Sequence, residues 1–134
     1  MSRIIAQCGP IQFEISLNRT QTAQAILKTL PIESIAQRWG EEIYFEIPVT
    51  MKNEAPTLDV SIGDVGYWPD GHCFCIFFGK TPASKGNQPK PASEVTVIGR
   101  TDASPVLLGK VREGERIWCR RRGSNSHGVA PTGF

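Results

Sequence analysis

The spacing of hydrophobic and polar residues predicts a chain made mainly of short strands. Residues 11–17 alternate without interruption, apolar at odd positions and polar at even ones, which is typical of a strand with one buried face. Residues 3–8 alternate more weakly and stop at Gly9-Pro10. We therefore expect these two segments to form a hairpin.

A helical spacing follows the hairpin. Capping side chains are plentiful over residues 18–22, and Pro31 cannot continue a helix. Between them, apolar residues recur at i, i+3, i+4 and i+7, namely Ala23, Ile26, Leu27 and Leu30. The pattern predicts one short amphipathic helix over about 21–30, which would cover a sheet or close the end of a barrel.

The densest apolar run, residues 73–78, reads Cys-Phe-Cys-Ile-Phe-Phe and is bounded by glycines and prolines. Such a run is typical of a strand that is buried on both faces, in the middle of a sheet. An aromatic pair, Tyr67-Trp68, precedes the run, and Thr81-Pro82 opens the loop after it. A core strand with such a pair at one end predicts a cleft there.

The remaining segments complete an all-β pattern. Residues 80–93 contain three prolines without periodicity and are predicted to form a loop. Residues 106–111 and 115–121 flank a turn and form either a last hairpin or a strand followed by a helix. The other predicted strands are 33–39, 42–49, 58–62 and 94–101. About eight short strands with one helix favour a closed barrel or a sandwich.

Composition narrows the class of protein. The 134 residues suit one domain, here 1–122, with 123–134 predicted as a disordered tail. The net charge of +2 is too small to predict nucleic-acid binding. There is neither an apolar run long enough to cross a membrane nor a charged-then-apolar leader, so we expect a cytoplasmic protein with free thiols.

The cysteines do not predict a reactive or metal-binding site. Cys73 and Cys75 lie two apart on one strand, where they face the same way and cannot easily form a disulfide. His72 precedes Cys73 directly, so in a strand it would point to the opposite face and could not act as its base. We therefore expect buried, inert thiols, and we predict no metal and no cofactor.

Several motifs resemble cyclophilins. The similarity includes the strand and helix over 11–31, the run 71–81 and the turn Gly-Lys-Val-Arg-Glu-Gly at 109–114. The chain is closer still to a small prokaryotic cyclophilin-like family of unassigned activity, through Arg-Trp-Gly-x-Glu-Ile-Tyr-Phe, Gly-Asp-x-x-Tyr-Trp-Pro-x-Gly and Cys-Ile-Phe-Phe-Gly-x-Thr-Pro, here at 38–45, 63–71 and 75–82. The resemblance covers roughly residues 4–120 and implies a closed eight-stranded barrel with one capping helix.

The resemblance does not extend to the residues of the prolyl isomerase reaction. Alignment places Glu46 where cyclophilins keep the arginine that engages the substrate, with Cys73 at their glutamine and Cys75 at their second phenylalanine. A carboxylate reverses the sign of the electrostatic effect that the arginine supplies. Arg38 is the nearby cation that could stand in, if its strand neighbours that of Glu46.

We therefore predict a non-catalytic domain that binds a small molecule or peptide in an aromatic cleft. An atypical peptidyl-prolyl isomerase and a structural or assembly module are the alternatives. We expect neither nucleic acid nor membrane as partners, and a monomer or weak homodimer. The candidate ligand-binding residues are Arg38, Trp39, Glu46, Tyr67, Trp68, Cys73, Cys75 and Thr81. For the three aromatic residues the competing interpretation is a core position, and for Arg38 and Glu46 it is a surface ion pair.

Overall fold

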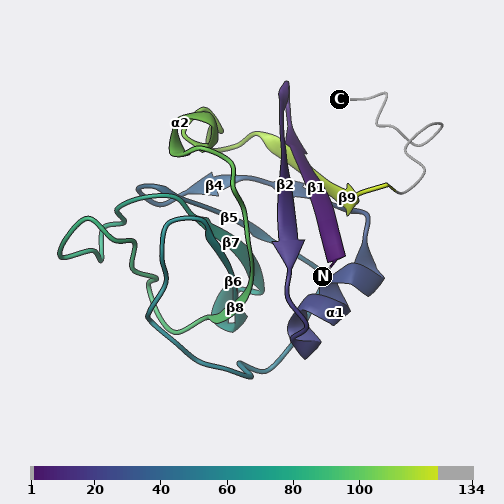
Figure 1. Cartoon of the computed structure of the whole chain (residues 1–134), viewed down its shortest axis with the longest axis horizontal. Helices are drawn as coiled ribbons and strands as arrows, with labels where there is room; N and C mark the ends of the chain where they lie inside the picture. Colours follow the sequence, from purple (N-terminus) through teal and green to yellow (C-terminus); the bar gives the residue numbers. More distant parts are fainter. Residues whose placement is uncertain (1, 124–134) are drawn as a thin grey trace.

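The computed structural model describes residues 2–123, which form one nine-stranded antiparallel sheet with two short α-helices and one turn of 3-10 helix at Pro69–Gly71 (Figure 1). The strand order is β3-β9-β1-β2-β8-β6-β7-β5-β4. The strands are β1 (Ser2–Cys8), β2 (Ile11–Leu17), β3 (Ile32–Ile35), β4 (Gln37–Arg38), β5 (Glu42–Glu46), β6 (Asp64–Trp68), β7 (Cys73–Phe77), β8 (Thr96–Arg100) and β9 (Arg116–Arg121).

The two edges of this sheet meet at one residue. β3 and β4 stand at opposite ends of the strand order, yet only Ala36 separates them in the sequence. The predicted strand 33–39 is therefore two strands: its first part pairs with β9 and its second part with β5. Ala36 is fully buried, and its small side chain fits at the bend. The sheet thus forms a nearly closed barrel, as the resemblance implies, with nine strands rather than the expected eight because the segment 33–39 is divided into two.

The predicted hairpin and helix are confirmed. β1 and β2 pair along their whole lengths, from Ser2 opposite Leu17 to Cys8 opposite Ile11. Helix α1 (Gln21–Thr29) begins at Thr20, whose hydroxyl accepts a hydrogen bond from the Ala23 N–H at 3.1 Å. In Figure 1, α1 and the second helix lie at opposite ends of the molecule.

The apolar run at 73–78 is confirmed as an interior strand. Every residue of β7 is buried, and the strand pairs with β5 on one side and β6 on the other. Successive side chains point to opposite faces. Phe74 and Ile76 therefore face the barrel interior, whereas Cys73, Cys75 and Phe77 form a second apolar cluster outside it.

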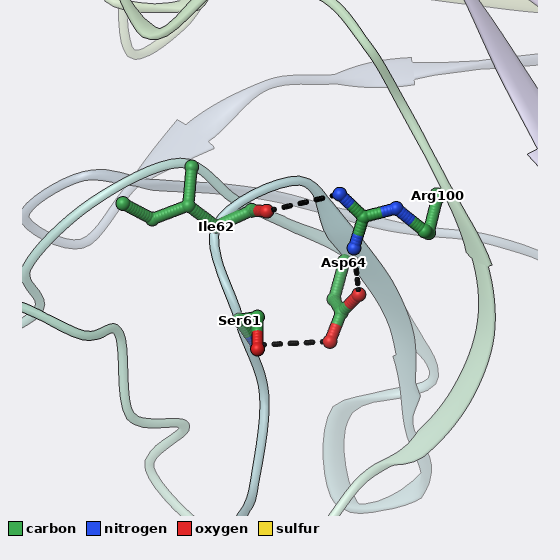
Figure 2. Close-up of polar contacts among 4 residues, drawn as sticks. All are labelled: Ser61, Ile62, Asp64 and Arg100. Atoms are coloured by element: carbon green, nitrogen blue, oxygen red, sulfur yellow. Dashed lines mark hydrogen bonds and ion pairs between the residues drawn. The ribbon is translucent and has the colours of Figure 1, made fainter.

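The predicted strand at 58–62 is wrong, and a strand follows it instead. The segment lies outside the sheet: the isolated bridge before it joins Thr57 to Val95, and the strand after it is β6. Figure 2 shows the contacts that hold the segment. The Asp64 carboxylate accepts a hydrogen bond from the Ser61 N–H at 2.8 Å and forms an ion pair with Arg100 at 2.8 Å. Arg100 also donates to the Ile62 carbonyl at 3.3 Å (Figure 2).

The segment 106–111 is not a strand: its first three residues belong to a helix, and a turn follows. Helix α2 (Pro105–Leu108) begins at Ser104, whose hydroxyl accepts from the Leu107 N–H at 3.0 Å. A serine cap followed by proline is a strong start signal for a helix, because proline lacks the N–H that a first turn leaves unpaired. Of the two possibilities for 115–121, the strand is correct, because β9 pairs with both β1 and β3.

Two further predictions, the absence of a membrane-spanning segment and the disordered C-terminal tail, can be compared with the structure only over the residues that it describes. In the part of the chain that the structure describes, neither helix is long and apolar enough to cross a membrane. The predicted tail at 123–134 lies, except for Gly123, outside the described residues.

Candidate functional site

An apolar pocket of about 120 Å³ lies on the outer face of the barrel. Its walls are aromatic: Trp39 from the turn after β4, Tyr44 from β5 and Trp68 from the end of β6. Glu42 and Cys75 line it on the sheet side. The loop after β7 closes another side with Pro91 and Ala92, and Val95 completes the wall.

A tight turn positions Trp39 and Glu42. The Trp39 N–H donates to the Glu42 carbonyl at 3.0 Å, and Gly40 between them has a φ of +61°, which favours glycine. The turn also lies against the loop, because the Glu41 N–H donates to the Lys80 carbonyl at 2.8 Å. A Cβ atom on Gly40 would lie 2.9 Å from that carbonyl oxygen. The turn thus brings the pocket wall against a segment forty residues later.

A hydrogen-bond chain and one packing contact hold the Trp68 ring in place. Its indole N–H donates to the Ser93 hydroxyl at 2.6 Å, and that hydroxyl donates to the Asp70 carboxylate at 3.2 Å. The ring also packs on Gly71, where a Cβ atom would lie 2.6 Å from the ring carbon Cζ3. Trp68 therefore connects β6 to the far end of the loop, and the pocket lies between them.

Thr81 organises the loop rather than lining the pocket. Its side chain is buried, and its hydroxyl donates to the Lys90 carbonyl at 2.5 Å across nine residues. The Thr81 N–H donates to the Ser84 hydroxyl at 3.0 Å, which in turn donates to the Gln88 carbonyl at 2.8 Å. These bonds fold the loop back on itself and place Pro91 against the pocket.

Glu42 is the unusual group of the site. Its side chain is 6 % exposed, and its Oε1 atom is buried without a hydrogen-bond partner. Burial raises the pKa of this carboxyl from 4.5 to about 7, although a hydrogen bond with Cys75 acts in the opposite direction. A carboxyl with such a pKa changes its charge near neutral pH.

The neighbouring thiols are held in their neutral form. Burial, followed by the charge of Glu42, raises the pKa of Cys75 well above its usual value. Burial raises the pKa of Cys73 to about 11, with smaller effects from Glu46 and Glu42. Because the thiolate is the nucleophile, both cysteines are poorly suited to covalent catalysis. All four cysteines of the chain are free and buried, as the sequence predicts.

The structure brings three of the eight candidate residues together: Trp39, Trp68 and Cys75 line the pocket. Cys73 on β7 and the exposed Glu46 on β5 lie opposite each other, on the same face of the sheet as the pocket. Neither residue lines the pocket. Tyr67 is not beside Trp68, because adjacent residues of a strand face opposite ways. It lies in the barrel core with no exposed surface, and its hydroxyl donates to the Val49 carbonyl.

Arg38 and Glu46 do not share a cleft. β4 does neighbour β5, but the register places Arg38 opposite Ile43. The Arg38 guanidinium donates to the carbonyl oxygens of Val111 at 2.8 Å, Gly40 at 3.0 Å and Gly109 at 3.3 Å. It also stacks over the Phe78 ring at 5.1 Å. These contacts tie the β4–β5 turn to the segment after α2, which is a structural role.

We expect Arg38→Ala to lower the free energy of unfolding by about 1–2 kcal/mol, because several carbonyls lose a charged donor. Arg38→Lys recovers little of it, since one ammonium cannot reproduce the fork of the guanidinium. Urea denaturation measures both, and Arg112→Ala, an exposed arginine, is the control. An unchanged stability of Arg38→Ala would contradict the structural role.

Sequence reasoning missed Glu42, Tyr44 and the loop residues. A signal for the first two was present: in the alternating run 42–49, Glu42 and Tyr44 share the face of Glu46. No comparable signal exists for Pro91 and Ala92, whose positions depend on how the loop folds. For metals, the described residues contain no group of three or more histidine, cysteine or acidic side chains placed to hold an ion.

Comparison with known proteins supports the fold and the resemblance. A solution structure of the hypothetical protein AF2241 from Archaeoglobus fulgidus matches with a TM-score of 0.76 and 39 % identity, covering 90 % of this chain and 94 % of that one. McbB in complex with tryptophan matches with a TM-score of 0.68 at 13 % identity, a likeness of fold alone. The match covers 91 % of this chain but 45 % of McbB.

Sequence comparison with curated proteins found no match. The family described as Cyclophilin-like, in contrast, matches residues 2–120. This range includes the barrel strands, with β9 up to Arg120, and every residue of the pocket. The chain therefore belongs to the Cyclophilin-like family.

Proposed function

We propose that this protein is a binding domain whose outer pocket takes a small, mainly apolar group of a ligand or peptide. The observation that carries the proposal is the convergence of Trp39, Tyr44 and Trp68 on one hollow, although the first two belong to the β4–β5 hairpin and the third to the end of β6. All three rings are partly exposed. Aromatic walls with a few polar groups are typical of ligand sites.

The volume of the pocket limits the size of that group. A cavity of roughly 150 Å³ can hold benzene, so a pocket of about 120 Å³ suits a group of five or six heavy atoms. A ligand this small gains at most about 1.5 kcal/mol per heavy atom. For five or six heavy atoms this ceiling is about 8 kcal/mol, so an isolated group can bind no more tightly than about micromolar. A molecule that also contacts the loop can bind more tightly.

The site favours binding over the reactions considered from the sequence. The Cys75 thiol is neutral at physiological pH, which disfavours nucleophilic catalysis. The arginine that could have replaced the isomerase cation, Arg38, is engaged with three carbonyl oxygens. Nucleophilic catalysis requires a thiolate, which Cys75 does not supply, and prolyl isomerisation requires a cation at the substrate, which the engaged Arg38 does not supply.

Tryptophan fluorescence tests this proposal, because two of the three tryptophans of the chain line the pocket. We expect members of a panel of neutral, cationic and anionic compounds of pocket size to change the emission. Trp68→Ala should abolish the change, because it removes one aromatic wall. Trp118→Phe, on β9, should retain it and is the control.

Melting temperature, recorded with the same compounds, checks the fluorescence result. A compound that binds the native state alone raises the melting temperature of the wild-type protein. If no compound of the panel alters emission or melting temperature, or if Trp68→Ala responds like the wild type, the pocket is not a binding site.

A further inference from the structure

A purely apolar ligand would leave the buried Glu42 Oε1 atom of the pocket without a hydrogen-bond partner. We propose that the pocket recognises a small alkylammonium group, whose N–H binds Glu42 while its alkyl carbons contact Trp39, Tyr44 and Trp68. This inference rests on the proposed function and adds to it the chemical class of the ligand. Simple amines, alkylated amines and lysine-like side chains all carry such a group.

The first argument is the unpaired oxygen. Glu42 lines the pocket and is more than nine-tenths buried, yet its Oε1 atom has no hydrogen-bond partner. An unpaired buried acceptor is rare in native proteins. Rotation about the last side-chain bond of a glutamate is broad, so either oxygen can turn to the pocket. A ligand with an N–H donor would supply the missing partner.

The second argument is the aromatic walls. The face of an aromatic ring is negative, so it attracts a cation placed over it, and tryptophan does so best. Two tryptophans and a tyrosine line the same hollow as the carboxyl. An alkylammonium satisfies both features at once, because its carbons contact the rings while its charge is shared between the rings and Glu42.

The third argument is the charge around the site. Glu42 is the one charged side chain among the pocket-lining residues, and no lysine or arginine lines the pocket. The titratable groups packed against it are Cys75 and Cys73 on β7 and Tyr44 on its own strand. The pKa values of all three are raised above their usual values, so they stay neutral near pH 7. Within the pocket lining a cation therefore meets the one carboxylate of Glu42, while the charges of Glu113, near Tyr44, and Glu46, near Cys73, add to the negative potential around it.

The same carboxyl gives the binding a defined pH dependence. With a pKa of about 7, Glu42 is protonated in part of the free protein at neutral pH. A cation binds the ionised form, so its affinity should fall roughly tenfold for each pH unit below that pKa and level off above it. A ligand that accepts a hydrogen bond from the protonated acid would show the opposite trend.

Three probes of nearly the same shape separate the contributions: tert-butylammonium has charge and N–H donors, tetramethylammonium has charge alone, and tert-butanol is neutral. Titration by tryptophan fluorescence should rank them in that order. We expect tert-butylammonium to bind roughly tenfold to a hundredfold more tightly than tert-butanol at pH 8. In Glu42→Gln, which keeps the shape but not the charge, that preference should disappear while tert-butanol still binds.

The results that would contradict the inference differ from those that would contradict the proposed function. If tert-butanol binds the wild type as tightly as the ammonium, or if ammonium binding strengthens at pH 5, the inference is wrong although the pocket is a binding site. The inference is equally wrong if Glu42→Gln retains the preference while its circular dichroism matches the wild type. If none of the three probes binds, and the panel described above also fails, both proposals fail together.

Discussion

Replacing Phe74 with alanine is expected to lower the free energy of unfolding by about 3–5 kcal/mol. Phe74 lies on the interior strand β7, is 1 % exposed, and belongs to the barrel core. Its ring stacks on that of Phe45 from the neighbouring strand, with centroids 5.0 Å apart. The truncation would leave a cavity in the middle of the core, where two paired strands prevent the backbone from collapsing into it.

Urea denaturation of the wild type and Phe74→Ala measures this loss. Val106→Ala is the control, because Val106 is 76 % exposed and its truncation should change stability by less than about 0.5 kcal/mol. A double-mutant cycle with Phe45→Ala isolates the contact between the rings, for which we expect about 0.5–1.5 kcal/mol of coupling. A loss near 1 kcal/mol for Phe74→Ala would show that this side chain is not in a packed core.

The second large effect is a pH dependence of stability that arises from Glu42. Its pKa is raised from 4.5 to about 7 by burial, so between these values the native state binds more protons than the unfolded chain. The contribution to stability is therefore complete below pH 4.5 and is lost as the pH rises through 7. The difference corresponds to about 3 kcal/mol at 1.36 kcal/mol per pH unit.

Glu42→Gln should remove this pH dependence. We expect the variant to gain stability relative to the wild type as the pH rises from 5 to about 8.5, by roughly 3 kcal/mol in total. Its absolute stability includes the cost of burying an amide, but that cost is the same at every pH. Urea denaturation across the range measures the difference, and Glu46→Gln, an exposed acid on the same strand, is the control. Parallel curves for wild type and Glu42→Gln would contradict the buried position of the carboxyl.

Much of the fold followed from local sequence patterns. The alternation at 11–17, the helical spacing up to Leu30 and the apolar run at 73–78 each report which side chains must be buried, and the structure confirms all three. The errors have local causes. The glycines at 63 and 66 weaken the strand pattern of β6, and the apolar residues 106–108, which resemble a strand, directly follow the helix start signal Ser104-Pro105.

The candidate site was less predictable than the fold, because its composition depends on which strands pair and in which register. Tyr67 and Trp68 are adjacent in the sequence, yet one lies in the core and the other lines the pocket. Their separation follows from the alternation of a strand, which fixes that they differ but not which faces inward. Register decides that, and it depends on the partner strands β7 and β8.

The amino-acid sequence by itself determined that this protein is built of short strands, one of them buried on both faces at 73–78, because hydrophobic periodicity reports burial directly. That these strands form a barrel was implied by the resemblance of its motifs to cyclophilins. The tertiary structure alone decided where the pocket is and what lines it. Pairing of β5 with β7 and the return of the loop over β6 bring Glu42, Trp39 and Trp68 together from distant positions. No local pattern encodes such contacts, since they exist only after the sheet has curled and the loop has folded across its outer face.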